Sequence, residues 1–214
     1  MAPRPKFTRA QLQEAALTLV DEQGLAALSM RSLAGAIGTG PMTLYNYVQD
    51  RDELDALVVE AVLAEVRRPR SHSADKAENW QADVRAIVEA TWRAVRRHPN
   101  VIPLVLTRRT LHDTTLQWAE GLLEALAQSG RRHVELLVAF RTVSGFVMGL
   151  AQAQLSGPTT DNADVARAEA LPADRYPRLI EIAKAARGLG PDREFRAGLD
   201  IVMAGLAAGT IRRS

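Results

Sequence analysis

The chain contains no cysteine among its 214 residues. Disulfide bonds, thiol nucleophiles and cysteine-ligated zinc are therefore excluded. Aromatic residues are also scarce, at 5% of the chain, whereas alanine, leucine, valine and arginine dominate. This composition favours helix over sheet. We expect a mostly α-helical protein with an ordinary globular core.

The two ends of the chain lack long apolar runs. Met1–Lys6 is basic and rich in proline, and no apolar run follows it, so it is unlike a signal peptide. Ile201–Ile211 is uncharged but shorter than the ~20 residues that span a membrane. We expect a cytoplasmic protein that has no membrane partner.

An excess of charge of one sign is also nearly absent, because 27 basic and 25 acidic residues leave a net charge of +2. Residues 1–70 carry eight basic and nine acidic groups, so bulk charge does not indicate DNA binding. Arg4, Lys6 and Arg9 nevertheless form a basic arm with no acidic residue beside them. Such arms bind nucleic acid or simply aid solubility, and both readings stay open.

Capping residues and glycines divide the N-terminal region into four helices. Thr8 and Gln11 fit a capping box that starts a helix over Arg9–Gln23. Ser29 can cap a second helix that ends at Gly38. We expect a third, short helix at 41–47. Asp50 or Asp52 caps a fourth helix that ends near Arg67. The predicted domains are residues 1–52, a connecting helix over 52–67, and a larger helical body over 68–214.

The body shows helical periodicity with two interruptions. We expect a hinge at 69–76 and a mobile connection at 157–173, because neither has a strong apolar period. The segment 134–155 is nearly uncharged, so it should be buried on most sides. The predicted helices of the body cover residues 79–98, 100–112, 113–129, 134–155, 174–187 and 192–209.

Two short helices around a glycine-containing turn make a helix-turn-helix unit, whose second helix can enter the major groove of DNA. Here that helix is 41–47, and its polar residues are unusual for a solvated surface. Thr43 and Asn46 can hydrogen-bond base edges or phosphates. Tyr45 and Tyr47 offer hydroxyls to phosphate oxygens.

Three runs carry a family resemblance: LSMRSLA at 28–34, TLYNYV at 43–48 and RDEL at 51–54. Together they resemble the TetR family of repressors, with Arg51 in place of the usual lysine. Residues 99–127 and 192–206 resemble its tetracycline-repressor branch. The resemblance implies an all-α fold, with a three-helix DNA-binding domain and a larger ligand-binding and dimerisation domain. It further implies a ligand-responsive repressor that binds a palindromic, double-stranded DNA operator as a homodimer.

The resemblance also assigns roles to single residues. Phosphate contacts fall to Ser29, Tyr45, Tyr47 and Arg51. Base reading falls to Arg31, Pro41, Met42, Thr43 and Asn46. Packing roles fall to Leu33, Ala34, Ile37, Leu44, Val48 and Leu54. For Tyr45 a half-buried place in the core is the alternative.

Small residues in the body favour close helix packing and hence dimerisation. Gly145, Gly149 and Ala153 recur every four residues, and the last helix holds Gly198, Ala204, Gly205, Ala208 and Gly209. We expect helices 132–155 and 192–209 to form a four-helix bundle with their symmetry copies. The alternative is that these glycines pack within one chain.

A small hydrophobic or aromatic effector is expected in the body. The candidate apolar lining is Trp92, Val105, Leu111, Trp118, Phe140, Phe146 and Met148. The candidate polar partners are Thr107, His112, Arg141 and Gln152. Ordinary core packing is the alternative for each. His72, His98, His112 and His133 are scattered, so we expect surface or capping roles for them, no metal site and no cofactor.

Catalytic motifs are absent from the sequence. Ser144 lacks the first glycine of a G-x-S-x-G elbow, and GLGPDR at 188–193 fits neither a dinucleotide fingerprint nor a P-loop. We therefore expect no enzyme. The remaining alternative is a DNA-binding or scaffold protein without an effector.

Overall fold

Helices account for every regular element in the computed structural model, which describes residues 6–66, 80–107, 113–155 and 162–208. The prediction of an all-α fold is confirmed. Two compact units divide the chain at Phe140 and Arg141, and each is described by itself. The hinge expected at 69–76 lies outside the described residues. The functional division near residue 68 stays a prediction.

The first helix, α1 (Arg9–Gln23), starts at the capping box that the sequence predicts. The Thr8 hydroxyl accepts a hydrogen bond from the Gln11 amide, and the Gln11 side chain accepts one from the Thr8 amide. Gly24 ends the helix at φ 79°, a backbone angle that glycine adopts without strain. A 3-10 turn, η1 (Leu25–Ala27), follows.

The helix-turn-helix consists of α2 (Met30–Ala36) and α3 (Pro41–Leu44). Ser29 caps α2, as predicted. Gly38 closes α2 at φ 68° and donates to the Gly35 carbonyl, while Thr39 donates to Ala34. These two bonds form a Schellman ending, which fixes the tight turn.

The third helix is shorter than predicted, because α3 ends at Leu44 instead of at residue 47. Tyr45 keeps right-handed helical backbone angles, and the Asn46 and Tyr47 amides donate to carbonyls three residues earlier. Such bonds tighten the last turn of a helix. Residues 45–47 therefore continue α3 as turns.

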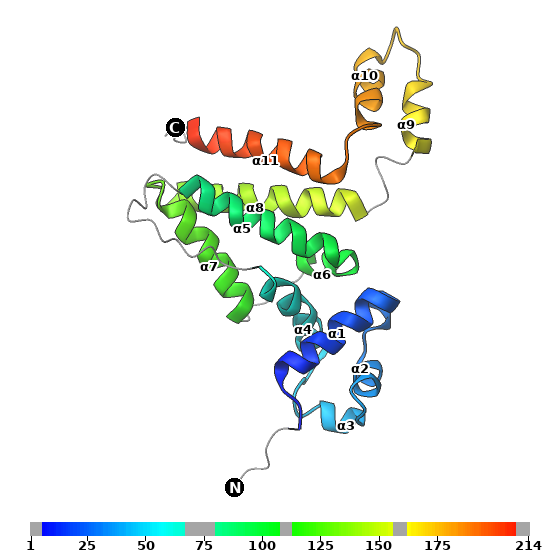
Figure 1. Cartoon of the computed structure of the whole chain (residues 1–214), viewed down its shortest axis with the longest axis vertical. Helices are drawn as coiled ribbons and strands as arrows, with labels where there is room; N and C mark the ends of the chain where they lie inside the picture. Colours follow the sequence, from blue (N-terminus) through cyan, green and yellow to red (C-terminus); the bar gives the residue numbers. More distant parts are fainter. Residues whose placement is uncertain (1–5, 67–79, 108–112, 156–161, 209–214) are drawn as a thin grey trace. The chain divides into compact units, whose positions relative to one another are not determined.

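The fourth helix, α4 (Arg51–Ala64), is capped by Asp50, whose carboxylate accepts the Glu53 amide at 2.8 Å. This contact identifies Asp50, and not Asp52, as the cap of α4. We call η1 and α1–α4 together the head; α1 packs along α4, with α2 and α3 beside them (Figure 1). The fully buried side chains of the head include Leu12, Leu28, Leu33, Leu44, Val48, Leu54 and Leu57.

The rest of the first unit begins with α5 (Trp80–Arg97), which buries one stripe of residues. That stripe comprises Val84, Ile87, Val88, Thr91, Trp92 and Val95. After it come η2 (Pro99–Val101), α6 (Ile102–Thr107), α7 (Asp113–Ala127) and the start of α8 (His133–Leu155). α7 packs against α4 and α5.

The second unit contains the rest of α8, then α9 (Asn162–Glu169), α10 (Pro177–Ala186) and α11 (Pro191–Ala208). Phe146 of α8 stacks on Phe195 of α11 with ring centroids 5.8 Å apart. The mobile connection expected at 157–173 is wrong over α9. This segment is rich in alanine and packs on α10, so propensity and a partner helix replace the missing apolar period.

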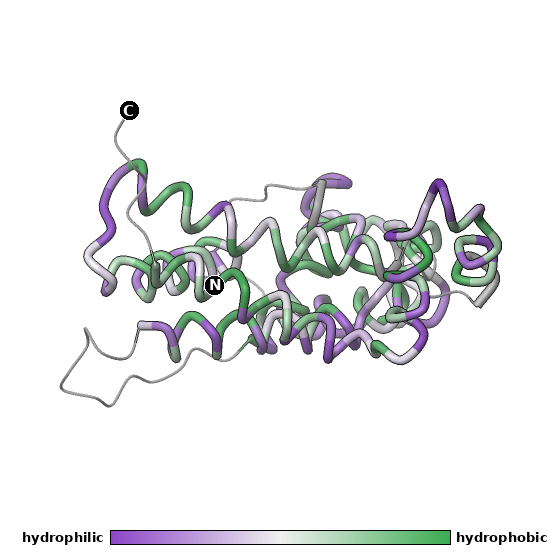
Figure 2. The backbone as a smooth tube through the Cα atoms, turned by 90° about the horizontal axis from the view of Figure 1, so that it is seen from above, coloured by the Kyte–Doolittle hydropathy of each residue, from purple (hydrophilic) through white to green (hydrophobic). Residues whose placement is uncertain are grey.

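Within the single chain, residues 134–153 bury one line of side chains, namely Ala139, Val143, Val147 and Ala151. The expectation that 134–155 is buried on most sides therefore requires a second copy and stays a prediction. Figure 2 shows hydrophobic and hydrophilic stretches alternating along the chain. By length and composition, His133–Ala153 would suffice to cross a membrane, with 22% of its apolar window buried. A single such helix is weak evidence for a membrane span.

Candidate DNA interface and cavity

The short helix α3 has a buried and an exposed side. Leu44 is fully buried, and Val48 just beyond the helix is buried with it. Met42 is 79% exposed and Tyr45 is 48% exposed. Asn46 is also exposed, whereas Thr43 is half-buried. The packing of Leu44 and Val48 therefore turns three side chains of different chemistry, a thioether, a phenol and an amide, toward solvent.

Tyr47 lies at the base of the basic arm. Its hydroxyl accepts hydrogen bonds from the Lys6 amide at 2.8 Å and the Phe7 amide at 3.4 Å. The Phe7 ring meets the Tyr47 ring edge-on at 6.0 Å between centroids. A hydroxyl that accepts two bonds still has its own hydrogen to donate, so a phosphate contact by Tyr47 is compatible with this arrangement.

Arg51 is bound within the head. Its Nε atom pairs with the buried Asp55 carboxylate at 2.8 Å, and its Nη1 atom donates to the Leu28 carbonyl at 2.5 Å. Guanidinium has five donors in a fixed plane. Arg51 therefore ties the start of α4 to Leu28, directly before Ser29, the cap of α2. The exposed Arg31 lies in the first turn of α2, and Arg51 has donors left for a phosphate.

A second ion pair fixes the root of the arm to α4. Arg9 donates from Nε and Nη2 to the buried Glu60 carboxylate at 2.9 and 2.8 Å, and Gln13 donates to the same group at 2.7 Å. The hydrogen bonds to Glu60 raise the pKa of Arg9 above its ordinary value. Arg9 therefore serves an ion pair within the head, while its side chain stays 46% exposed. Within the described residues, Lys6 is a further exposed cation next to Tyr47.

A cavity of about 270 Å³ lies among α4, α5 and α7. Its lining is Leu63, Ala64, Val66, Ile87, Thr114, Gln117, Trp118 and Gly121. The lining combines apolar side chains with polar atoms from Thr114 and Gln117. The Trp118 indole donates to the Thr91 hydroxyl at 3.0 Å, so its orientation is fixed.

The predicted effector residues are spread over several places, and one of them, Trp118, lines this cavity. Phe140 packs near Trp118 at 6.2 Å, Val105 packs on the core of the first unit, and Trp92 is fully enclosed. The other four described residues belong to the second unit: Arg141 and Gln152 are exposed, Met148 is half-buried and Phe146 packs on Phe195. Leu111, His112 and the Thr107 side chain lie outside the described residues.

Sequence reasoning missed the residues that α4 and the turn after it contribute to the cavity. Leu63, Ala64 and Val66 look like ordinary core positions along a helix, because nothing in their spacing shows that a void lies beside them. It also missed His98, whose ring contacts residues 77 and 33 positions away in the sequence. The capping or surface role expected for His98 is wrong, because its ring makes no capping bond and bridges two carboxylates instead.

Comparisons with known proteins agree with this geometry. Residues 73–210 match the family model described as "Tetracyclin repressor-like, C-terminal domain". The HTH-type transcriptional repressor DrrR1 of Streptomyces coeruleorubidus is 31% identical over 95% of this chain and 78% of its own length. An HTH-type transcriptional regulator of Saccharopolyspora erythraea is also 31% identical, over 96% of this chain and 86% of its own.

Solved structures give the same result. The TetR family protein ActR of Streptomyces coelicolor, in complex with (S)-DNPA, has a TM-score of 0.82 and 31% identity over 98% of this chain and 100% of its own. Its complex with actinorhodin has a TM-score of 0.81 and 29% identity, with both chains covered completely.

A capped helix-turn-helix with an exposed second helix, joined to a helical body, defines a DNA-binding transcriptional regulator. The chain belongs to the TetR family of transcriptional regulators.

Proposed function

We propose that this protein is a repressor that binds a palindromic operator as a homodimer and releases it when a small aromatic molecule occupies the cavity. The observation that carries the DNA-binding part is the two-sided burial of α3. Leu44 anchors the helix in the head, and Met42, Tyr45 and Asn46 project from it. A regulator of this kind acts in the cytoplasm, where the DNA is.

The proposed DNA contacts divide into two kinds. Thr43, Asn46 and Met42 read bases with Pro41 and Arg31 beside them, and Ser29, Tyr45, Tyr47 and Arg51 bind phosphates. Phosphate contacts set register without reading sequence, whereas base contacts discriminate. Selection of bound fragments from random DNA should return a palindrome, because two identical heads must meet major grooves about 34–36 Å apart.

Two variants separate these roles on the selected operator. Tyr45→Phe removes only the hydroxyl and should weaken binding to every sequence by a similar factor. Asn46→Ala should instead relax the preference at one base pair per half-site, by about 1–3 kcal/mol of discrimination. Fluorescence anisotropy with matched and single-mismatch duplexes measures both. Gln23→Ala, at the exposed end of α1, is the control; wild-type behaviour of both α3 variants would contradict the proposed interface.

Dimerisation is supported by the uncovered faces of α8 and α11. On α8 the exposed residues include Val134, Leu137, Val138, Gly145 and Gly149. On α11 they include Ile201, Ala204, Gly205 and Ala208. A side chain added at Gly145, Gly149 or Gly205 would meet no atom within 4 Å, whereas one at Gly198 would meet Phe146 at 2.6 Å. Gly198 therefore packs within the chain, and the other three glycines are free for a second copy.

The effector is inferred from the cavity. Trp118, Ile87 and Leu63 suit a compact aromatic molecule, and Gln117 or Thr114 suits a polar substituent on it. ActR structures contain (S)-DNPA and actinorhodin, so these two compounds are the first probes. Either should raise the melting temperature and release the operator, and Gly121→Phe should abolish both effects by filling the cavity. Silence toward both probes and toward a wider aromatic set would favour a regulator without an effector.

A further inference from the structure

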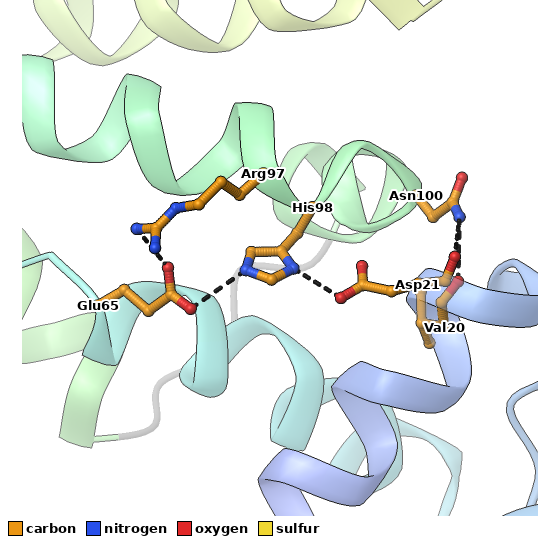
Figure 3. A network of polar contacts seen from close by, with 6 residues as sticks. All are labelled: Val20, Asp21, Glu65, Arg97, His98 and Asn100. Carbon is orange, nitrogen blue, oxygen red and sulfur yellow. Dashed lines mark hydrogen bonds and ion pairs between the residues drawn. The ribbon is translucent and has the colours of Figure 1, made fainter.

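A polar cluster joins the C-terminal ends of α1 and α4 to the turn that follows α5 (Figure 3). The His98 ring lies at its centre, with Nδ1 at 2.7 Å from Asp21 Oδ2 and Nε2 at 3.1 Å from Glu65 Oε1. Arg97 pairs with the other Glu65 oxygen at 2.6 Å. Asn100 donates to the backbone carbonyls of Val20 at 3.0 Å and Asp21 at 3.3 Å.

The partners of the ring determine its charge state. Ionised carboxylate oxygens only accept hydrogen bonds, and a neutral imidazole has only one donor. Both ring nitrogens of His98 face carboxylates, so the arrangement is satisfied only when both carry a proton. The side chain of His98 is 14% exposed, whereas those of Asp21 and Glu65 are 31% and 29% exposed, so the ring is mostly enclosed and water reaches the two carboxylates.

The ends of two helices strengthen the preference for a cation. α1 ends at Gln23 and α4 at Ala64, and the C-terminal end of a helix carries partial negative charge that cations stabilise. The charged groups in contact with the ring or its partners are Asp21 from α1, Glu65 after α4 and Arg97 from α5. With His98 protonated the cluster is neutral, and with His98 deprotonated it carries one unbalanced negative charge. In the described part of the chain no three histidine or acidic side chains could hold a metal ion.

The cluster adjoins the cavity through the last turn of α4. Leu63, Ala64 and Val66 line the cavity, and Glu65 stands between them in the sequence. The amides of Glu65 and Val66 donate to carbonyls three residues earlier, so this segment is one short turn. A molecule that fills the cavity and displaces this turn must therefore displace the Glu65 carboxylate as well.

We propose that His98 is a positioning residue that, in its doubly protonated form, holds the head against α5, and that filling of the cavity reaches α1 through the Glu65–His98–Asp21 contacts. We call these contacts the His98 latch. The second part of the proposal rests on the proposed function, whereas the charge state does not. The latch is complete when both ring nitrogens of His98 carry a proton and both carboxylates are ionised.

The charge state is tested directly on the full-length protein without DNA or effector. In protein with ¹⁵N-labelled histidine, the two ring nitrogens of His98 should both show the shifts of an imidazolium at pH 7, and the His98→Gln variant assigns the signals. A pair of unequal shifts, typical of a single neutral tautomer, would overturn the proposal whether or not the protein binds DNA.

The positioning role is tested by the operator affinity of His98 variants at pH 7. His98→Gln should bind the operator about 5- to 20-fold more weakly than wild type, in the usual range for coupled sites. Asp21→Asn with His98→Gln should recover much of the affinity, because two amides can hydrogen-bond. His133→Gln, at the start of α8, is the control and should keep wild-type affinity. Wild-type affinity in His98→Gln, or no recovery in the double variant, would refute the role.

Transmission from the cavity is tested by a double-mutant cycle that needs no effector. Thr114→Trp fills the cavity from α7 and should lower operator affinity in the wild-type background. In the His98→Gln background the same substitution should have little further effect, because the route is already broken. Additive losses, or no loss from Thr114→Trp in a protein that remains folded by circular dichroism, would show that the latch does not carry the signal.

Discussion

The head and the paired helices α8 and α11 use apolar residues in opposite ways. In the head, Leu33, Leu44 and Leu57 are fully buried within the one chain. On α8 and α11, Val134 is 67% exposed and Ile201 is 75% exposed. A single chain therefore completes the core of the head but leaves one face of each long helix uncovered. Helical periodicity in a sequence therefore identifies an apolar face that must be buried. It does not indicate whether the same chain or a second copy buries that face.

The largest expected effect comes from a substitution in the core of the head, which a single chain completes. Leu44→Ala should lower the free energy of unfolding by about 2–5 kcal/mol, because it leaves a cavity in the core of the head. Met42→Ala, two residues away on the exposed side of the same helix, should change it by less than about 0.5 kcal/mol. Chemical denaturation measures both. Equal effects from the two substitutions would mean that α3 is not two-sided.

The next prediction concerns the uncovered face. Gly149→Arg has room within the chain, since a side chain there meets nothing within 4 Å. In a dimer it places a charge in an apolar interface, so the dissociation constant should rise at least 100-fold, or about 2.8 kcal/mol. Sedimentation velocity measures the change, with Thr18→Arg on the exposed side of α1 as the matched charge control. A dimer unchanged by Gly149→Arg would place the interface elsewhere.

The smallest effect lies at the ion pair that joins α9 to the end of α10. The hydrogen bonds from Arg187 lower the pKa of Glu169 below its ordinary value. The pair therefore stabilises the folded unit at neutral pH, and this stabilisation is lost as pH falls through the lowered pKa. Glu169→Gln should speed amide exchange in α9 at pH 7 and make it equal to wild type at low pH. Because the pair is exposed, the difference should be small, and a larger difference at low pH would contradict the assignment.

Local chemistry explains which parts of the fold were predictable. The bounds of α1 follow from Thr8, Gln11 and Gly24, and the start of α2 follows from Ser29, because caps act through neighbours in the sequence. The prediction of an irregular connection at 157–173 was wrong over α9, because this helix depends on packing against α10. The buried stripe of α5 was predictable, since burial on one side leaves a period of 3.6 residues in the sequence.

Parts of the candidate site were also predictable from local sequence, whereas other parts were not. The exposed residues of α3 and the buried Leu44 could be assigned from a seven-residue segment and its family resemblance. The bonds of Tyr47 to Lys6 and of Arg51 to Leu28 could not, because they join residues 41 and 23 positions apart. The cavity beside Trp118 was equally hidden, since a void is a property of how three helices pack.

The sequence by itself determined the all-helical class, the caps of α1 and α2 and the short helix that we propose to contact DNA, because each depends on residues a few positions apart. Only the tertiary structure decided where the cavity lies, which glycines remain uncovered, and that His98 stands between Asp21 and Glu65. These features depend on distances between segments far apart in the chain, and packing, not local propensity, sets those distances.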